Sequence, residues 1–135
     1  MDIGKLFNIA GKTALVTGGS GGIGYMIAEG LASAGVAVTI CSRKADGVDM
    51  AVKALSRSGD VTGFAADLAT EEGIATAAEK MGAKPLHILV NNAGATWGAA
   101  IGEFPRKGFE KVLGLNLLAP FLLTQALLPA LRKAG

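Results

Sequence analysis

The sequence has one cysteine and one histidine among its 135 residues, and this scarcity limits the chemistry that it can support. Cys41 has no partner for an internal disulfide, and its apolar neighbours Val38 and Ile40 indicate a buried strand position, so we expect a reducing, cytoplasmic location. A metal site needs several ligands, and Cys41 and His87 stand at no spacing that is typical of one. We therefore expect no bound metal and interpret His87 as a structural residue.

Blocks of one charge sign are also absent from the chain. It carries 13 basic and 11 acidic residues, a formal net charge of +2, and these are spread along its length. Such a balance gives no electrostatic argument for a nucleic-acid partner. The first residues include an acid, Asp2, and no sustained apolar core, so we expect no secretory signal peptide.

Residues 112–131 carry no charge, which by length alone makes them a candidate for a membrane span. Asn116, Gln125 and two prolines within this run are costly or disruptive in lipid, and lysines and arginines flank both ends without a clear bias. We expect no membrane association. A helix that is apolar around much of its circumference is otherwise buried, either in a core or between subunits.

Glycine, in contrast, is abundant, with 20 residues, and a glycine-rich stretch at 17–24 organises the rest of the chain. We expect Gly18 to form a tight turn, Gly22 to let the backbone approach a pyrophosphate, and Gly24 to let a helix pack against its strand. Unpaired N–H groups at that helix start favour an anion. An ordinary turn would explain the glycines alone, but the strand before, the helix after and a further strand near Val36 are the context of a nucleotide-binding turn. Gly19, Ser20 and Ile23 complete the expected cofactor-binding residues of this stretch.

Apolar runs that are typical of strands alternate with helical patterns along the chain. Strands are expected at 13–16, 36–41, 61–65 and 86–90, and helices at 22–34, 45–57 and 71–81, the last one capped by Thr70. This alternation predicts an α/β domain over residues 1–135, with a parallel sheet, right-handed crossovers and helices on both faces. A full doubly wound sheet has six or more strands, so we expect an incomplete domain with an unpaired fourth strand and an uncovered last helix.

Four features in order resemble the N-terminal half of a short-chain dehydrogenase/reductase. They are the turn at 17–24, the Asp67-Leu68 pair after the third strand, the Asn-Asn-Ala-Gly run at 91–94 after the fourth, and Asn116 in the long helix. The resemblance implies a Rossmann-type doubly wound sheet with strand order 3-2-1-4 in three layers. It also implies that Asp67 accepts from the adenine amino group beside Leu68, that Ala93 and Gly94 let the backbone pass close to the cofactor, and that Asn91 braces the central strand.

The residues at the end of the second strand determine the choice between NAD and NADP, and an acid there would bind the ribose 2′-OH of NAD. Ser42 occupies that place, and Arg43 and Lys44 follow it. A guanidinium beside a hydroxyl suits a 2′-phosphate, so NADP is favoured over NAD. Relatives that prefer NADP often carry a basic residue where this chain has Gly21, and a solvated Arg43 remains the alternative.

The resemblance further implies a catalytic tyrosine, a lysine four residues after it, and a serine, and the sequence supplies none of these at a suitable place. Tyr25 is the only tyrosine, it is followed four residues later by Glu29, and it lies beside the expected phosphate turn. Asn116 alone matches the catalytic group. Its expected part is to hold a water of a proton relay where the helix bends, and Gly114 and Pro120 make such a distortion plausible.

Residues 89–98 resemble bacterial 3-oxoacyl-carrier-protein reductases, including the type tied to rhamnolipid synthesis. This resemblance implies the cofactor half of an NADP(H)-dependent oxidoreductase that acts on a ketone, 3-oxoacyl-like, or a secondary alcohol, and that forms a dimer or tetramer when complete. The chain alone is expected to be inactive. A non-catalytic module that binds a dinucleotide or a partner is the alternative, and Trp97 fits a substrate mouth as well as a loop or interface.

Overall fold

The central strand β1 (Thr13–Thr17) determines the architecture, because every side chain from Ala14 onward in it is buried. In the computed structural model, which describes residues 2–135, β1 pairs in parallel with β2 (Ala37–Ser42) and β4 (Ile88–Val90). β2 pairs in parallel with β3 (Val61–Ala65), which gives the order β3-β2-β1-β4. The expected strand order is therefore confirmed.

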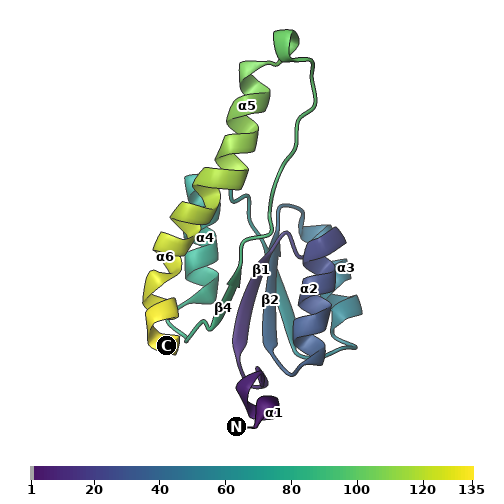
Figure 1. Ribbon diagram of the computed structural model, residues 1–135, viewed down its shortest axis with the longest axis vertical. Helices are drawn as coiled ribbons and strands as arrows, with labels where there is room; N and C mark the ends of the chain where they lie inside the picture. The colour runs from purple at the N-terminus through teal and green to yellow at the C-terminus, as the bar shows by residue number, and fades with distance from the viewer. Residues whose placement is uncertain (1) are drawn as a thin grey trace.

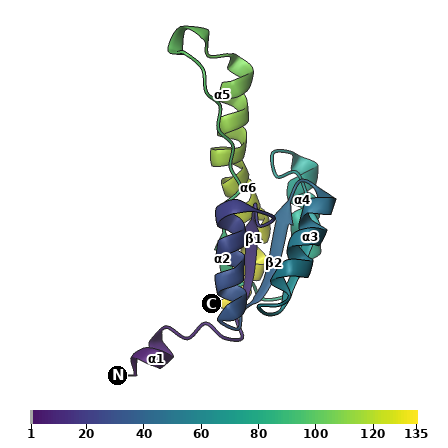
Figure 2. The same cartoon turned by 90° about the vertical axis from the view of Figure 1, so that its right-hand side faces the viewer.

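Helices cover both faces of this sheet, as Figures 1 and 2 show. On one face α2 (Gly22–Ser33) and α3 (Ala45–Leu55) pack against Ala14 and Val16 of β1. On the other face α4 (Glu71–Met81) and α6 (Ala119–Ala134) pack against Leu15. Successive strand residues point to opposite faces, so a strand between two helical layers is apolar at every position.

Several helix and strand ends follow from local signals in the sequence. The Thr70 hydroxyl accepts a hydrogen bond from the Gly73 N–H at 3.0 Å and caps α4 as expected. Gly35, with φ of 82°, follows α2 and takes the left-handed conformation that ends a helix. The fourth strand begins at Ile88 and not at residue 86, because the Leu86 N–H donates to the Ala130 carbonyl of α6 at 3.0 Å.

A continuous helical stretch closes the chain and rises beyond the carboxyl ends of the strands (Figures 1 and 2). It consists of α5 (Arg106–Leu113), the π-helical segment η2 (Gly114–Leu118) and α6. The chain leaves β4, runs up beside α5, forms the short helix η1 (Ile101–Glu103) and returns as α5. We call residues 95–113 the arm.

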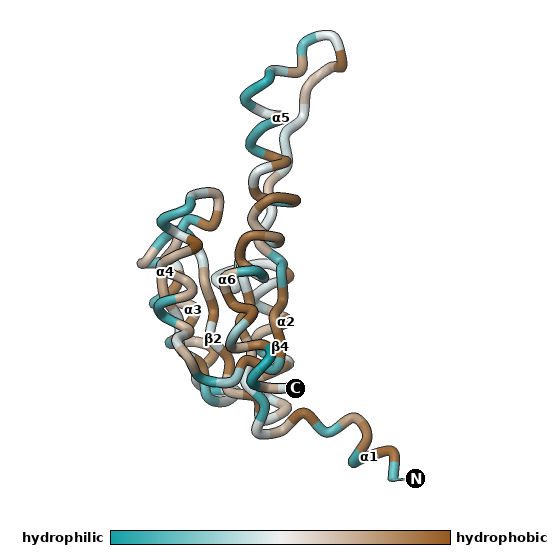
Figure 3. Tube along the Cα trace, turned by 90° about the vertical axis from the view of Figure 1, so that its left-hand side faces the viewer, coloured by the Kyte–Doolittle hydropathy of each residue, from teal (hydrophilic) through white to brown (hydrophobic). Residues whose placement is uncertain are grey.

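The stretch from Arg106 to Ala134 is long and apolar enough to cross a membrane by length and composition, which for a single helix is weak evidence. Leu123 and Leu127 face α4 and are buried, whereas the apolar window of the stretch is 17% buried as a whole. Leu117 and Phe121 on the same stretch are 66% and 64% exposed, and Figure 3 shows the apolar residues of this region along the tube. The expected uncovered apolar surface is therefore present.

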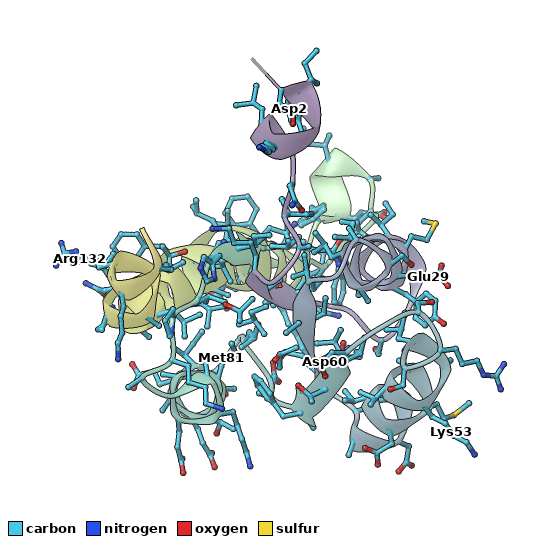
Figure 4. The ribbon with its side chains drawn as sticks, turned by 90° about the horizontal axis from the view of Figure 1, so that it is seen from below. Asp2, Glu29, Lys53, Asp60, Met81 and Arg132 are labelled. Carbon is cyan, nitrogen blue, oxygen red and sulfur yellow. The ribbon has the colours of Figure 1, made fainter. Side chains whose placement is uncertain are left out.

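Charged side chains lie at the periphery of the three layers. Figure 4, viewed from the end of the sheet opposite the arm, shows Glu29, Lys53 and Arg132 pointing away from the sheet. The short helix α1 (Ile3–Leu6) precedes the sheet, and the Asp2 side chain accepts from the Gly4 N–H at its start. The interior therefore consists of the two apolar clusters on either side of β1.

Candidate functional site: a dinucleotide cleft

The glycine turn follows β1, and two of its glycines have positive φ, a backbone conformation that glycine adopts without strain. Gly18 and Gly22 have φ of 67° and 55°, and the Gly18 N–H donates to the Cys41 carbonyl of β2 at 2.7 Å. A Cβ on Gly24 would overlap the carbonyl oxygen of Gly18, so the start of α2 packs directly against the strand end. A Cβ on Gly22 would meet nothing within 4 Å. The side of the turn at Gly22 is thus open, as close approach by a ligand requires.

The first turn of α2 has no side-chain cap. Gly21 stands at the N-cap position and has no side chain that could accept a hydrogen bond, so the first N–H groups of the helix remain available to a ligand or to water. Ile23 beside them is 66% exposed. These N–H groups and the helix dipole form a site that favours an anion without any basic side chain.

The ends of β1 and β4 are tied together by Thr17 and Asn92. The buried Thr17 hydroxyl accepts from the N–H groups of Asn92 (3.0 Å) and Ala93 (2.9 Å) and donates to the Val90 carbonyl (3.2 Å). The Asn92 side-chain Nδ2 donates to the carbonyls of Thr17 and Gly18 at 3.0 and 3.4 Å. The role expected of Asn91 thus belongs to Asn92, because Asn92 is half-buried against β1 whereas Asn91 is exposed.

Two hydroxyl groups and a guanidinium lie together at the end of β2. The Ser20 hydroxyl donates to the Ser42 hydroxyl at 2.9 Å, and the Ser20 N–H donates to it at 3.3 Å. Arg43 and Lys44 follow directly and are exposed. A cation and two hydroxyls beside the glycine turn are complementary to a phosphate, whereas a carboxylate would be complementary to a ribose diol.

The expected adenine-contacting pair follows β3. Leu68 is 5% exposed and belongs to the apolar cluster on the α4 and α6 side. Asp67 is exposed, and its carboxylate accepts from the Ala69 N–H at 3.0 Å in a local turn. This bond occupies one carboxylate oxygen and fixes the side chain at the edge of the sheet.

A cleft of about 500 Å³ lies between these elements at the carboxyl ends of the strands, where β1 and β4 mark the switch in strand order. It brings together seven of the expected cofactor-binding residues: Gly18, Ser20, Ser42, Arg43, Leu68, Ala93 and Gly94. Nine further residues line the cleft that were not among the expected cofactor-binding residues: Gly21, Cys41, Lys44, Gly47, Ala66, Ala95, Thr96, Lys111 and Leu115. Lys111 and Leu115 come from the arm and η2, and no local signal places them here.

Asn116 lies in η2, where the helix is distorted as expected. The Ala119 N–H donates to the Gly114 carbonyl, the i to i+5 spacing of a π-helix. The Asn116 side chain binds one residue of the β4 loop twice: its Oδ1 accepts from the Ala95 N–H at 2.7 Å, and its Nδ2 donates to the Ala95 carbonyl at 2.9 Å. The side chain therefore positions the wall of the cleft, and the expected relay water stays a prediction.

A family model described as short chain dehydrogenase matches residues 12–135. The chain belongs to the short-chain dehydrogenase family. This membership agrees with the sheet order and with the position of the cleft at the carboxyl ends of the strands.

The relatives of this chain have names that refer to different substrates. The chain is 48% identical over 131 residues to the rhamnolipids biosynthesis 3-oxoacyl-[acyl-carrier-protein] reductase of Pseudomonas aeruginosa, covering 96% of this chain and 51% of that protein. It is 36% identical over 126 residues to gluconate 5-dehydrogenase of Gluconobacter oxydans, covering 90% and 48%. The chain spans about half the length of the curated relatives it matches.

Solved structures of relatives have the same fold. The Pseudomonas aeruginosa RhlG/NADP active-site complex matches with a TM-score of 0.91 at 47% identity, covering 96% of this chain and 51% of that one. L-sorbose reductase from Gluconobacter frateurii, complexed with NADPH and L-sorbose, matches with a TM-score of 0.87 at 33% identity, covering 95% and 50%. The chain therefore has the Rossmann-like fold of these structures.

Two residues with reactive side chains, Tyr25 and Cys41, lie close to the core. Tyr25 is partly buried and packs against the core on the α2 and α3 side. Burial raises the pKa of the Cys41 thiol from its ordinary value of 9.0 to about 12, so the thiol is protonated at neutral pH. Tyr25 is not among the residues that line the cleft, and the Cys41 thiol, which lines it, keeps its proton at neutral pH.

A second, apolar cavity of about 900 Å³ lies within the arm. Its lining includes Trp97, Ile101, Phe104, Phe109 and Leu113. The Trp97 ring packs on Gly108, where a Cβ would come within 2.7 Å of the ring. Trp97 thus packs the loop of the arm against α5, and its expected place at a substrate mouth stays a prediction.

Proposed function

We propose that residues 1–135 form the NADP(H)-binding part of an oxidoreductase that transfers a hydride between NADPH and a ketone or secondary alcohol. The observation that carries this proposal is the grouping of Ser20, Ser42 and Arg43 beside an uncapped helix start in one cleft. The solved relatives described as complexes with NADP and NADPH support it.

In this proposal each part of the cleft binds a different part of the cofactor. The open turn at Gly22 and the first N–H groups of α2 bind the pyrophosphate. Ser42 and Arg43 bind the 2′-phosphate, and Leu68 with Asp67 binds the adenine. The proposed cofactor-binding residues as a whole are Gly18, Gly19, Ser20, Gly22, Ile23, Gly24, Ser42, Arg43, Asp67, Leu68, Asn91, Ala93 and Gly94.

The cofactor supplies the hydride, and carbonyl reduction then requires a proton donor for the developing alkoxide. Asn116 is proposed to hold a relay water close to the reacting atoms. Since its side-chain atoms are engaged with Ala95, this water would bind backbone groups that the π-helical segment leaves free. The only tyrosine lies elsewhere, so we propose that these 135 residues bind the cofactor and do not catalyse the reaction alone.

The substrate of the whole protein is proposed to be a 3-oxoacyl-like ketone. The relative named as a 3-oxoacyl-[acyl-carrier-protein] reductase, at 48% identity, supports this assignment. We further propose a cytoplasmic homo-oligomer, since the exposed apolar residues Leu117 and Phe121 of the last helices need a cover. The missing proton donor also favours a second candidate, a module that binds a dinucleotide and catalyses nothing.

A calorimetric titration with NADP⁺ and NAD⁺ tests the cofactor assignment. Wild type should bind NADP⁺ more tightly, and Arg43→Ala should weaken NADP⁺ binding about ten- to a hundredfold while changing NAD⁺ binding much less, because a charge-assisted hydrogen bond is lost. Lys53→Ala on the exposed face of α3 is the matched control. An equal loss for both cofactors in Arg43→Ala would refute the 2′-phosphate assignment.

A further inference from the structure

Lys111 of α5 presents a cation to the cleft from an element that the cofactor assignment does not use. Its Nζ lies 5.6 Å from the centroid of the Trp97 ring, and the residue lines the same cleft as Arg43 and Lys44. The ring itself is held against Gly108. A cation over a fixed aromatic ring is attracted to its face, so the ammonium has a defined place at the wall of the cleft.

The negative charge nearest to Lys111 in sequence is already engaged. Glu110 forms an ion pair with Arg106, Nε to Oε1 at 2.6 Å, one turn earlier on the same helix. Within residues 2–135, no carboxylate lies at ion-pair distance from the Lys111 ammonium. Lys111 is therefore a cation in a cleft that also contains Arg43 and Lys44, and such a cleft favours an anionic ligand.

The glycine turn offers no cation of its own to such a ligand. Gly21 has no side chain, and a Cβ there would meet nothing within 4 Å, so the space beside the turn is empty of protein. A dinucleotide with several phosphate charges therefore has cationic partners only on the β2 end and on the arm. Lys111 is the cation that the arm contributes to the lining.

We propose that Lys111 is a cofactor-binding residue whose ammonium leaves the Trp97 ring and binds a phosphate of bound NADP(H). This inference rests on the proposed function and extends it to the arm. Lys111 would close the cleft over the cofactor by linking α5 to the ligand. The phosphate is either the 2′-phosphate or the pyrophosphate, and NAD⁺, which has only the pyrophosphate, distinguishes them.

Trp97 provides a direct signal for this movement, because it is the only tryptophan in the chain. Removing an ammonium from the face of the indole should change its emission. NADP⁺ is the suitable probe, since its oxidised nicotinamide does not absorb where indole emits. Emission and calorimetry together separate a contact of Lys111 with the ligand from a purely structural role.

The test compares Lys111→Ala and Lys111→Arg with Lys107→Ala, a control one turn earlier on the same exposed helix and outside both cavities. Lys111→Ala should weaken NADP⁺ binding about three- to tenfold, less than a fully buried charge would, because the lysine is exposed and gives up its contact with the ring. It should also lower the salt dependence of binding and abolish the change in Trp97 emission. Lys111→Arg should keep most of the affinity, and Lys107→Ala should behave as wild type.

The titrations separate the two proposals. An equal loss of NAD⁺ affinity in Lys111→Ala assigns the contact to the pyrophosphate, and a loss confined to NADP⁺ assigns it to the 2′-phosphate. Wild-type NADP⁺ affinity in Lys111→Ala, together with weakened binding in Arg43→Ala, overturns the role of Lys111 and leaves the proposed function standing. Failure of folded wild type to bind NADP⁺ refutes the proposed function itself.

Discussion

Thr17 is the residue on which the geometry of the cleft depends most directly, and Thr17→Val tests this dependence. Its hydroxyl is buried and makes three hydrogen bonds, two from backbone N–H groups at 3.0 and 2.9 Å and one to the Val90 carbonyl at 3.2 Å. Valine has nearly the same shape, so the substitution removes the hydroxyl without opening a cavity.

The magnitude follows from the number of bonds lost. Each is worth about 1 kcal/mol, and the bonds are partly accessible to water, so a loss of about 2–3 kcal/mol in the free energy of unfolding is expected. The buried methyl group offsets at most about 1 kcal/mol of this loss. A domain is stable by about 5–15 kcal/mol, so Thr17→Val should still fold and should show a clearly lower urea midpoint.

Thr39→Val is the matched control for this measurement. The Thr39 hydroxyl bonds only the Thr62 hydroxyl at 3.1 Å on an exposed part of β2, so its removal should change stability by less than about 0.5 kcal/mol. Thr17→Val should also weaken NADP⁺ binding, because Asn92 and Ala93 lose a hydrogen bond that holds the cleft wall, and Thr17→Ser should restore most of it. Equal stability of Thr17→Val and wild type in urea would show that the cleft wall does not depend on this hydroxyl.

Two further predictions concern catalysis and pH. The 135-residue chain should show no NADPH oxidation with ketones or 3-oxoacyl thioesters. A positioned general acid typically raises the reaction rate about 10²- to 10⁴-fold, and we identify none in this chain. Substrate-dependent loss of NADPH absorbance above a no-protein blank would contradict this prediction. For Cys41, the folded-state pKa of about 12 exceeds the ordinary value of 9.0, so the unfolded chain loses this proton first as the pH rises. The contribution of this thiol to stability should be complete below pH 9 and should fall between pH 9 and 12. Urea unfolding at neutral and alkaline pH should show a loss in wild type that is absent from Cys41→Ala, and identical pH profiles would refute it.

Sequence reasoning succeeded where the signals are local. The bounds of β3 and α4 match expectation, because the Thr70 cap and the apolar run from Val61 are short-range signals. The distortion near Asn116 also appeared where expected. The first strand, the second strand and the helix at 45–57 each shifted by one or two residues, which is the usual variation of element ends.

Sequence reasoning was limited where contacts join distant segments. It expected Asn91 to brace β1, but the side chain that does so is that of Asn92, since only the packed chain determines which of two adjacent asparagines faces the strand. Lys111 and Leu115 line the cleft from α5 and η2, which stand at the carboxyl ends of the strands, and no local pattern encodes this placement. The start of β4 depends on a bond from Leu86 to Ala130 of α6.

The double hydrogen bond between Asn116 and Ala95 has a consequence for the wall between the two cavities. The Asn116 amide pairs with both backbone groups of Ala95, in the loop that follows β4, and so joins this loop to the π-helical segment. Ala95 lines both the nucleotide cleft and the apolar cavity of the arm. The two cavities therefore share a wall, and the pair of hydrogen bonds from Asn116 fixes the backbone of that wall.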